Sequence, residues 1–148
     1  MNNHIGFTGT RKGITPLQRN IFQELLSDER WDEPQVFHHG GCVGADAQVH
    51  SIVQAFGHYE ISVWPGNLTA QRHYTIEPPY YIHAIRPPLD RNQMIVDHCN
   101  VLIAISGTEE ETLRSGAWAT IRYARKQGKR IIIITPSGQI IREGVETR

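Results

Sequence analysis

The sequence predicts a Rossmann-like α/β fold: a doubly wound, mostly parallel sheet of about five strands with helices on both faces. Short apolar runs alternate with segments of helical periodicity, which is typical of βα units on a parallel sheet. Every glycine-rich turn falls where an expected strand ends. The chain has 148 residues, a length that suits one core, so we expect a single domain over residues 1–148.

The expected strands are short runs that contain mainly apolar residues. The last of them contains four consecutive isoleucines, which predicts a strand buried in the centre of the sheet. The final ten residues are expected to form either a short edge element or no regular structure. The five runs are His4–Phe7, Gln35–His38, Glu60–Trp64, Val101–Ile105 and Arg130–Thr135.

Four helices are expected between these strands. Thr15 is the predicted N-cap of the first, with Pro16 at its first position, and the second runs to about Phe56. Asp90 is expected to cap a short helix over 91–98, and Ser115 to cap a helix over 116–127. Residues 66–89 show no clear periodicity, and so long a connection is more often functional, for example a lid, than incidental.

Composition limits the classes of function. Fifteen Lys and Arg balance fifteen Asp and Glu, which argues against a protein that binds nucleic acid through a general positive field. No apolar run reaches the roughly 18 residues of a membrane span, and the first residues lack the pattern of a signal peptide. Two cysteines cannot form a disulfide framework. We therefore expect a cytoplasmic protein that does not act at a membrane.

Three segments at strand ends are candidates for ligand binding. Gly9-Thr10-Arg11 offers a sharp turn, a hydroxyl and a guanidinium for phosphate or carboxylate. The turn over residues 40–46 holds three glycines before a helix start, which predicts a phosphate cradle of free backbone N–H groups. Asp46 either caps that helix or accepts hydrogen bonds from a ribose. Ser115-Gly116 starts a further helix at the same edge, and Arg91 and Thr120 could reach a ligand from either side.

Together these segments resemble the SLOG superfamily, which includes the DprA/Smf proteins, the LOG-type nucleoside-monophosphate phosphoribohydrolases and their "lysine decarboxylase-like" relatives. The motifs follow the family's order over about residues 4–138, closest to small single-domain members from bacteria and phages. They are Gly9-Thr10-Arg11, Gly40-Gly41-Cys42-Val43-Gly44-Ala45-Asp46 with His50, Pro88-Leu89 with Arg91-Asn92, and Arg114-Ser115-Gly116-Ala117-Trp118. The resemblance implies a Rossmann-like nucleotide-binding domain.

The chain departs from the LOG hydrolases at one motif. Arg91 and Met94 match the family's Arg-x-x-Met. The partner motif, Pro-Gly-Gly-x-Gly-Thr-x-x-Glu, is absent, because residues 115–118 occupy that turn and Thr120 or Ile121 stands at the position of the catalytic Glu. Loss of a general acid or base typically lowers a rate by ~10²–10⁴-fold. The remaining catalytic candidates are Arg91 with Glu110 or Glu111 in the preceding loop.

Other chemistries have weaker support in the sequence. The spacing of His38, His39, Cys42 and His50 fits no standard zinc pattern, so no metal is expected. His50 is expected to pack or hydrogen-bond behind the glycine turn, and Cys42 has no nameable base partner for nucleophilic catalysis. Trp118 is expected either in the core or an interface, or in base stacking.

We therefore expect a protein that senses or sequesters a nucleotide or nucleotide-derived ligand, such as an ADP-ribose-type molecule, at the carboxyl edge of the sheet and needs no cofactor. The alternatives are a LOG-like phosphoribohydrolase and a DprA-like single-stranded DNA binder. A homo-oligomer is also expected, because the helix over 116–127 is apolar around much of its girth. The expected ligand-binding residues are Gly9, Thr10, Arg11, Gly40, Gly41, Val43, Gly44, Ala45, Asp46, Arg91, Asn92, Ser115, Gly116 and Thr120.

Overall fold

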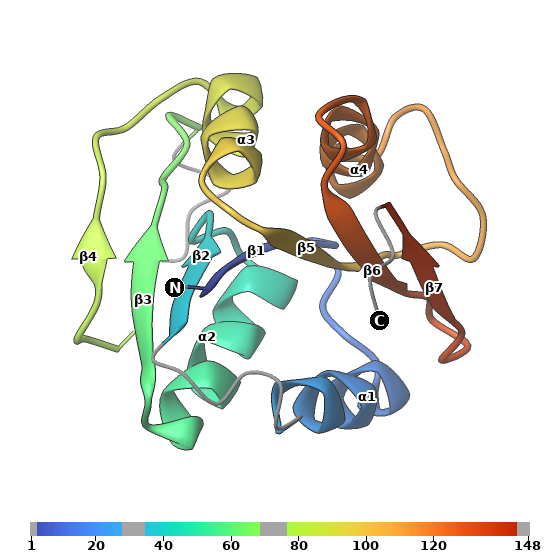
Figure 1. Ribbon diagram of the computed structural model, residues 1–148, viewed down its shortest axis with the longest axis horizontal. Helices are drawn as coiled ribbons and strands as arrows, with labels where there is room; N and C mark the ends of the chain where they lie inside the picture. Colours follow the sequence, from blue (N-terminus) through green and yellow to red (C-terminus); the bar gives the residue numbers. More distant parts are fainter. Residues whose placement is uncertain (1–2, 28–34, 69–76, 145–148) are drawn as a thin grey trace.

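A seven-stranded sheet forms the middle layer of the protein, and two pairs of helices cover its two faces (Figure 1). The computed structural model describes residues 3–27, 35–68 and 77–144. The strand order is β4-β3-β2-β1-β5-β6-β7, and every neighbouring pair is parallel except β6 and β7. This architecture confirms the expected α/β class with a mostly parallel, doubly wound sheet.

The five expected strands form the centre of the sheet. β1 lies in the middle, with Ile5 paired to Phe37 on one side and to Val101 on the other. The expected bounds differ from the observed ones by two residues at most. The strands are β1 (Asn3–Gly9), β2 (Gln35–His39), β3 (Tyr59–Val63), β5 (Val101–Ile105) and β6 (Arg130–Ile134).

Two short edge strands extend the sheet beyond the expected five. β4 (Tyr81–Ile82) pairs in parallel with β3, and both of its residues are exposed, so no alternation of burial marks it in the sequence. β7 (Ile140–Glu143) pairs antiparallel with β6 after a tight turn. Of the two expectations for the final ten residues, the short edge element is the one observed.

The helices lie in pairs on opposite faces of the sheet. In Figure 1, α1 (Pro16–Leu26) and α2 (Ala45–Phe56) lie below the sheet, and α3 (Pro88–Asp97) and α4 (Gly116–Lys126) lie above it. Thr15 caps α1 as expected, since its hydroxyl accepts a hydrogen bond from the Gln18 N–H at 3.0 Å. Ser115 caps α4 as expected, by accepting from the Trp118 N–H at 3.2 Å.

The expected start of α3 is wrong by three residues. The helix begins at Pro88, with Pro87 in the N-cap position, and Asp90 lies inside its first turn. Proline suits the first helical position because its fixed φ fits the helix and its missing N–H would have had no partner there. Pro88 therefore marks the start of the helix, and Asp90 adds only a favourable charge near the helix dipole.

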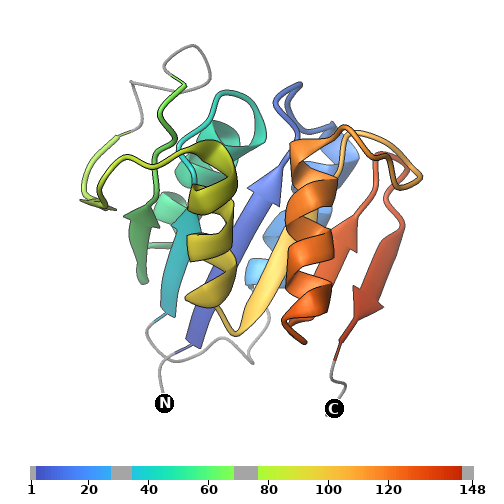
Figure 2. The ribbon, with the colours of Figure 1, turned by 90° about the horizontal axis from the view of Figure 1, so that it is seen from above.

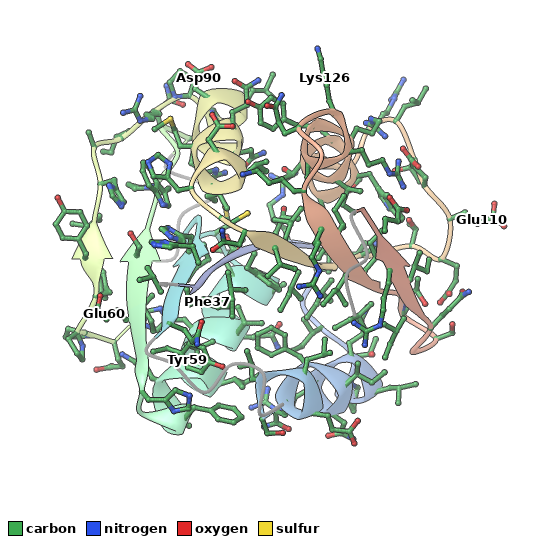
Figure 3. The ribbon with its side chains drawn as sticks, in the orientation of Figure 1. Phe37, Tyr59, Glu60, Asp90, Glu110 and Lys126 are labelled. Atoms are coloured by element: carbon green, nitrogen blue, oxygen red, sulfur yellow. The ribbon has the colours of Figure 1, made fainter. Side chains whose placement is uncertain are left out.

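A separate apolar core fills the space on each face of the sheet. Below it, Phe7, Phe22 and Phe37 pack together with ring centroids 5.7–6.1 Å apart, and Figure 3 shows Phe37 between the sheet and α2. Above it, Trp118 and Ile121 of α4 pack against the sheet and are 3% and 0% exposed. Trp118 therefore belongs to the core of the protein, one of its expected roles, and α4 has less unburied apolar surface than its sequence indicated.

The order of the strands creates a reversal next to β1. From β1 the chain proceeds to β2 and β3 on one side, and later to β5 and β6 on the other. The carboxyl ends of these parallel strands meet at one edge, where α3 and α4 also begin (Figure 2). No helix of the described residues is long and apolar enough to cross a membrane.

Candidate functional site

A cavity of about 450 Å³ opens at the carboxyl edge of the sheet, beside the reversal at β1. Ligands of open α/β sheets bind at this switch point, and small-molecule sites usually measure about 300–1,000 Å³. The walls come from the loop after β1, the turn after β2, and the first turns of α3 and α4. The position and size of the cavity both suit a small ligand.

The structure brings most of the expected ligand-binding residues to this cavity. Gly41, Val43, Gly44, Ala45 and Thr120 are the exceptions, because they do not line it. Thr120 is 2% exposed, and its hydroxyl donates to the Gly116 carbonyl at 3.0 Å. The expected residues that do line the cavity are Gly9, Thr10, Arg11, Gly40, Asp46, Arg91, Asn92, Ser115 and Gly116.

Sequence reasoning missed three polar residues and an apolar wall. Lys12, Cys42 and Arg114 line the cavity, and each stands inside or next to a motif that had been singled out. These three residues could have been predicted from their position in or beside those motifs. The apolar lining includes Pro88 and Leu89, which belong to one of the motifs of the resemblance, and Leu68 and Ile95, which the sequence gave no reason to place at a ligand site.

Three N–H groups of the glycine turn after β2, those of Gly40, Gly41 and Cys42, already have acceptors within the protein. The Asp46 carboxylate accepts hydrogen bonds from the N–H groups of Gly40 and Cys42, both at 3.1 Å. The Gly41 N–H donates to Nδ1 of His39 at 2.9 Å. A carboxylate of the protein therefore takes the position that an external anion would need. Asp46 lies in the first turn of α2, whose N-cap, Gly44, has no side-chain cap hydrogen bond, so its carboxylate closes the glycine turn instead of capping the helix.

Packing explains why two residues of these loops are glycines. At Gly44, φ is +87°, and a Cβ atom would overlap the backbone of Arg11. At Gly40, a Cβ atom would overlap the guanidinium of Arg91 and come within 3.1 Å of Asp46. The glycines thus let the β1 loop and a buried arginine approach the turn closely.

Arg91 places a buried positive charge on the floor of the cavity. The residue is 5% exposed, and its Nη1 donates to the carbonyls of Gly40 at 2.9 Å and Trp64 at 3.1 Å. Its Nε donates to the Asn92 side chain at 2.7 Å. No carboxylate of the described residues forms an ion pair with it. Carbonyls thus hold the guanidinium in place and leave its charge unneutralised by direct pairing.

Asp46 and Arg91 interact electrostatically without forming an ion pair. Burial raises the pKa of the Asp46 carboxyl above its ordinary value, while the Arg91 charge and then the two backbone N–H donors oppose this rise. Burial also raises the pKa of the neighbouring Cys42 thiol to about 11, and Asp46 adds to this effect. Cys42 is thus protonated near neutral pH and is a poor nucleophile.

Two buried histidines, His39 and His50, form a hydrogen-bonded chain that begins at the glycine turn. Because His39 Nδ1 accepts from the Gly41 N–H, its Nε2 carries the proton and donates to Nδ1 of His50 at 2.8 Å. His50 Nε2 then donates to the Glu77 carbonyl at 2.8 Å. Burial first, and then His50 and Arg91, lower the pKa of His39 to about 3. His50 thus lies behind the glycine turn as expected, in a chain of hydrogen bonds from Gly41 through His39 to Glu77.

Three exposed basic side chains form a positive rim of the cavity, and one of them, Arg114, directly precedes α4. Arg11, Lys12 and Arg114 are exposed cavity-lining residues. The space in front of Gly116 is open, since a Cβ atom there would meet nothing within 4 Å. Ser115 satisfies the Trp118 N–H, and no described residue accepts from the first N–H groups of the helix. A helix N-terminus with basic side chains around it attracts anions.

The acidic loop before α4 lies outside the cavity. Glu111 forms ion pairs with Arg122 at 3.0 Å and Arg125 at 2.8 Å, and the hydrogen bonds from these arginines lower the pKa of its carboxyl. Glu110 lies on the outer part of the loop (Figure 3) and, like Glu111, does not line the cavity. The two catalytic candidates are therefore away from Arg91. Within the described ranges, no group of three or more His, Cys, Asp or Glu side chains is placed to hold a metal ion.

Comparison with known proteins identifies a similar fold. The X-ray structure of TM1055, a target of the Northeast Structural Genomics Consortium, matches with a TM-score of 0.61 at 17% sequence identity. The match covers 87% of this chain and 72% of that chain. At this identity the likeness shows the Rossmann-like fold alone. No family model and no curated protein matches the chain, so an argument about function depends on the cavity itself.

Proposed function

We propose that the protein binds a nucleotide or nucleotide-derived ligand in this cavity and acts as a sensor or a sequestering protein. One observation carries the proposal: four basic side chains line the cavity, whereas the one carboxylate among its described lining residues is already hydrogen-bonded to the glycine turn. Such an excess of positive charge in a recess favours an anionic ligand. The basic residues are Arg11, Lys12, Arg91 and Arg114.

In this proposal the phosphate binds at the start of α4, with Lys12 and Arg114 beside it. The N–H groups of Gly40 and Cys42 donate to Asp46 and that of Gly41 donates to His39, so these three do not compete for the phosphate. The apolar wall, which includes Leu68 and Leu89, suits the flat face of a base. A ligand with one charged end and one flat end uses both parts of the cavity.

Three further expectations belong to the same proposal. We propose that the chain is a member of the SLOG superfamily, because its motifs surround the cavity in that family's order. We also propose a cytoplasmic location and a homo-oligomer. For the oligomer, the argument from α4 no longer applies, since Trp118 and Ile121 are buried within one chain. Light scattering at micromolar concentration tests it directly.

Calorimetry with AMP and ADP-ribose at low salt tests the proposal. Charge-assisted hydrogen bonds contribute about 1.5–3 kcal/mol each, so Lys12→Ala and Arg114→Ala should each weaken binding by roughly 10- to 100-fold. Arg19→Ala is the matched control, because Arg19 is an exposed residue of α1 that does not line the cavity. Absence of binding at millimolar concentration of both ligands, or equal affinity in all three variants, would reject the proposal.

A further inference from the structure

A short strap lies beside the cavity and contributes to its wall. We use this term for residues 81–89, which run from β4 to the first turn of α3. Pro88 and Leu89 at the end of the strap line the cavity. Few backbone hydrogen bonds join the strap to the sheet beyond the two-residue pairing of β4: His83 N–H donates to Val63 at 2.9 Å and Arg86 N–H to Pro65 at 3.2 Å.

His83 is the side chain that anchors the middle of the strap. Its ring stacks on the indole of Trp64 with centroids 3.4 Å apart and planes 9° from parallel. Its Nε2 lies 2.6 Å from the Ser62 hydroxyl. The other large apolar side chains nearby, Tyr81, Ile82 and Ile85, are more than half exposed and add little attachment. The closed position of the strap thus depends heavily on one imidazole.

Trp64 connects this anchor to the floor of the cavity. Its indole N–H donates to His38 Nδ1 at 3.0 Å, and its backbone carbonyl accepts from Arg91 Nη1 at 3.1 Å. The same Arg91 nitrogen donates to the Gly40 carbonyl at 2.9 Å. A change at the stack of His83 and Trp64 therefore acts on both the wall and the buried cation of the site.

The surroundings of the stack are rich in basic groups. Arg86 is partly buried, and its Nε has no hydrogen-bond partner among the described residues. No carboxylate of the described residues acts on His38 or His83. A proton added to His83 would therefore meet like charge without a compensating acid. The titratable and charged groups that face the stack are His4 of β1, His38 of β2, Tyr81 and Arg86 of the strap, and His98 after α3.

We propose that the strap is a pH-sensitive closure of the cavity, which protonation of His83 releases from Trp64. The release itself follows from the stack and its surroundings, and its effect on ligand affinity rests on the proposed function. When the strap is released, Pro88 and Leu89 move out of the cavity wall, and the cavity loses part of its apolar surface.

The direction of the effect follows from linkage. In the closed position, burial lowers the pKa of His83, and the charges of His98 and Arg86 lower it further. A released, solvated imidazole regains an ordinary pKa of about 6.5. The released position therefore binds the proton more tightly, so acid favours release. Release should therefore weaken the binding of an anionic ligand as pH falls. Without release, the affinity for an anion would increase as pH falls, because added protons would increase the positive charge near the site.

Amide hydrogen exchange of the ligand-free protein tests the release directly. We expect the opening constant at the amides of residues 83 and 86, corrected for intrinsic chemistry, to rise by up to about tenfold between about pH 7.5 and about pH 5.5. The Ile103 amide, in the centre of the sheet, reports global unfolding and serves as the internal reference. His83→Phe keeps a flat ring against Trp64 without a titrating group, so its strap amides should show no such rise.

Arg86→Gln provides a second variant in case His83→Phe does not fold. It removes one repelling charge and should reduce the rise of exchange at the strap amides. If strap exchange in the wild type does not respond to pH, or responds equally in His83→Phe, the closure is refuted whatever the ligand does.

ADP-ribose is the probe for the ligand arm, since its two diester-type phosphates keep the same charge over this pH range. Its affinity should fall as pH falls in the wild type, whereas in His83→Phe it should stay level or rise. If the affinity of the wild type for ADP-ribose stays level or rises as pH falls, the strap does not control ligand binding in the cavity. If ADP-ribose and AMP both fail to bind at about pH 7.5, the proposed function fails, while the exchange measurement still decides on the strap.

Discussion

Acid should destabilise this protein through two buried histidines, His38 and His39. Both are nearly inaccessible to solvent, at 3% and 0% exposed. Burial is the main cause that lowers the pKa of each from 6.5 to about 3. Nearby imidazoles add to the shift at both positions, and Arg91 adds to it at His39. Each ring is held neutral, since its Nδ1 accepts a hydrogen bond, from the Trp64 indole for His38 and the Gly41 N–H for His39.

The sign and size of the effect follow from these pKa values. Between about pH 6.5 and about pH 3 the unfolded chain binds a proton at each position and the folded chain does not, so stability falls as pH falls. Each group contributes about 1.36 kcal/mol per pH unit well below its unfolded pKa. The two together should lower the free energy of unfolding by about 4 kcal/mol between about pH 7.5 and about pH 5. Stability should be nearly level above about pH 7, where neither form is protonated.

Urea unfolding followed by circular dichroism at a series of pH values measures this slope. His38→Gln and His39→Gln each remove one titrating ring, so each should roughly halve the slope below about pH 6, whatever the stability at neutral pH. His58→Gln is the control, because His58 is exposed. A wild-type stability that stays level down to about pH 5, or a slope that neither core variant changes, would show that these rings are not held neutral by the fold.

Three other predictions address the glycine turn and the chemistry of the site. Asp46→Ala leaves the N–H groups of Gly40 and Cys42 without their acceptor, so it should cost about 2–4 kcal/mol of stability in urea unfolding; an unchanged midpoint would contradict this role. Gly44→Ala adds overlap with the Arg11 backbone to the strain of a positive φ, whereas Gly57→Ala has a similar φ of +82° and open space around it. Gly44→Ala should therefore lower the melting temperature clearly more than Gly57→Ala, and equal losses would contradict the packing argument. Incubation with AMP, GMP, CMP and UMP should release no free base by chromatography over hours, because Glu110 and Glu111 do not line the cavity; release that disappears in Arg91→Ala would establish the hydrolase instead.

The central fold could be predicted from the sequence because its signals are local. Four consecutive isoleucines and the apolar run over Val101–Ile105 correspond to β6 and β5, and Thr15 and Ser115 cap the helices they precede. The start of α3 was misplaced because Asp90 is a common N-cap residue, whereas Pro88 fixes the first turn by its backbone geometry. β4 could not be found, since two exposed residues carry no periodic pattern and pair only because β3 lies beside them.

The edge of the sheet where the cavity opens could be predicted from the sequence, but the hydrogen bonds around the cavity could not. Glycine spacing indicated which turns meet at the carboxyl edge. It did not indicate that Asp46 folds back onto the N–H groups of its own turn. It also could not show that Arg91, 51 positions from Gly40, fills the space that the missing side chain leaves. Contacts between residues so distant in sequence depend on the assembled sheet and leave no mark on local patterns.

The position of Asp46 decides where an anion can bind. A second negative group at the glycine turn would meet the buried Asp46 carboxylate and three N–H groups that already have acceptors. At the start of α4, by contrast, the space before Gly116 is open, and Lys12 and Arg114 line the same cavity. Arg91 lies beside the glycine turn and is bound by carbonyl oxygens, which hold it without neutralising its charge. In the proposed function the two ends of the cavity therefore have different tasks: the glycine turn fixes the buried arginine, and the start of α4 takes the phosphate.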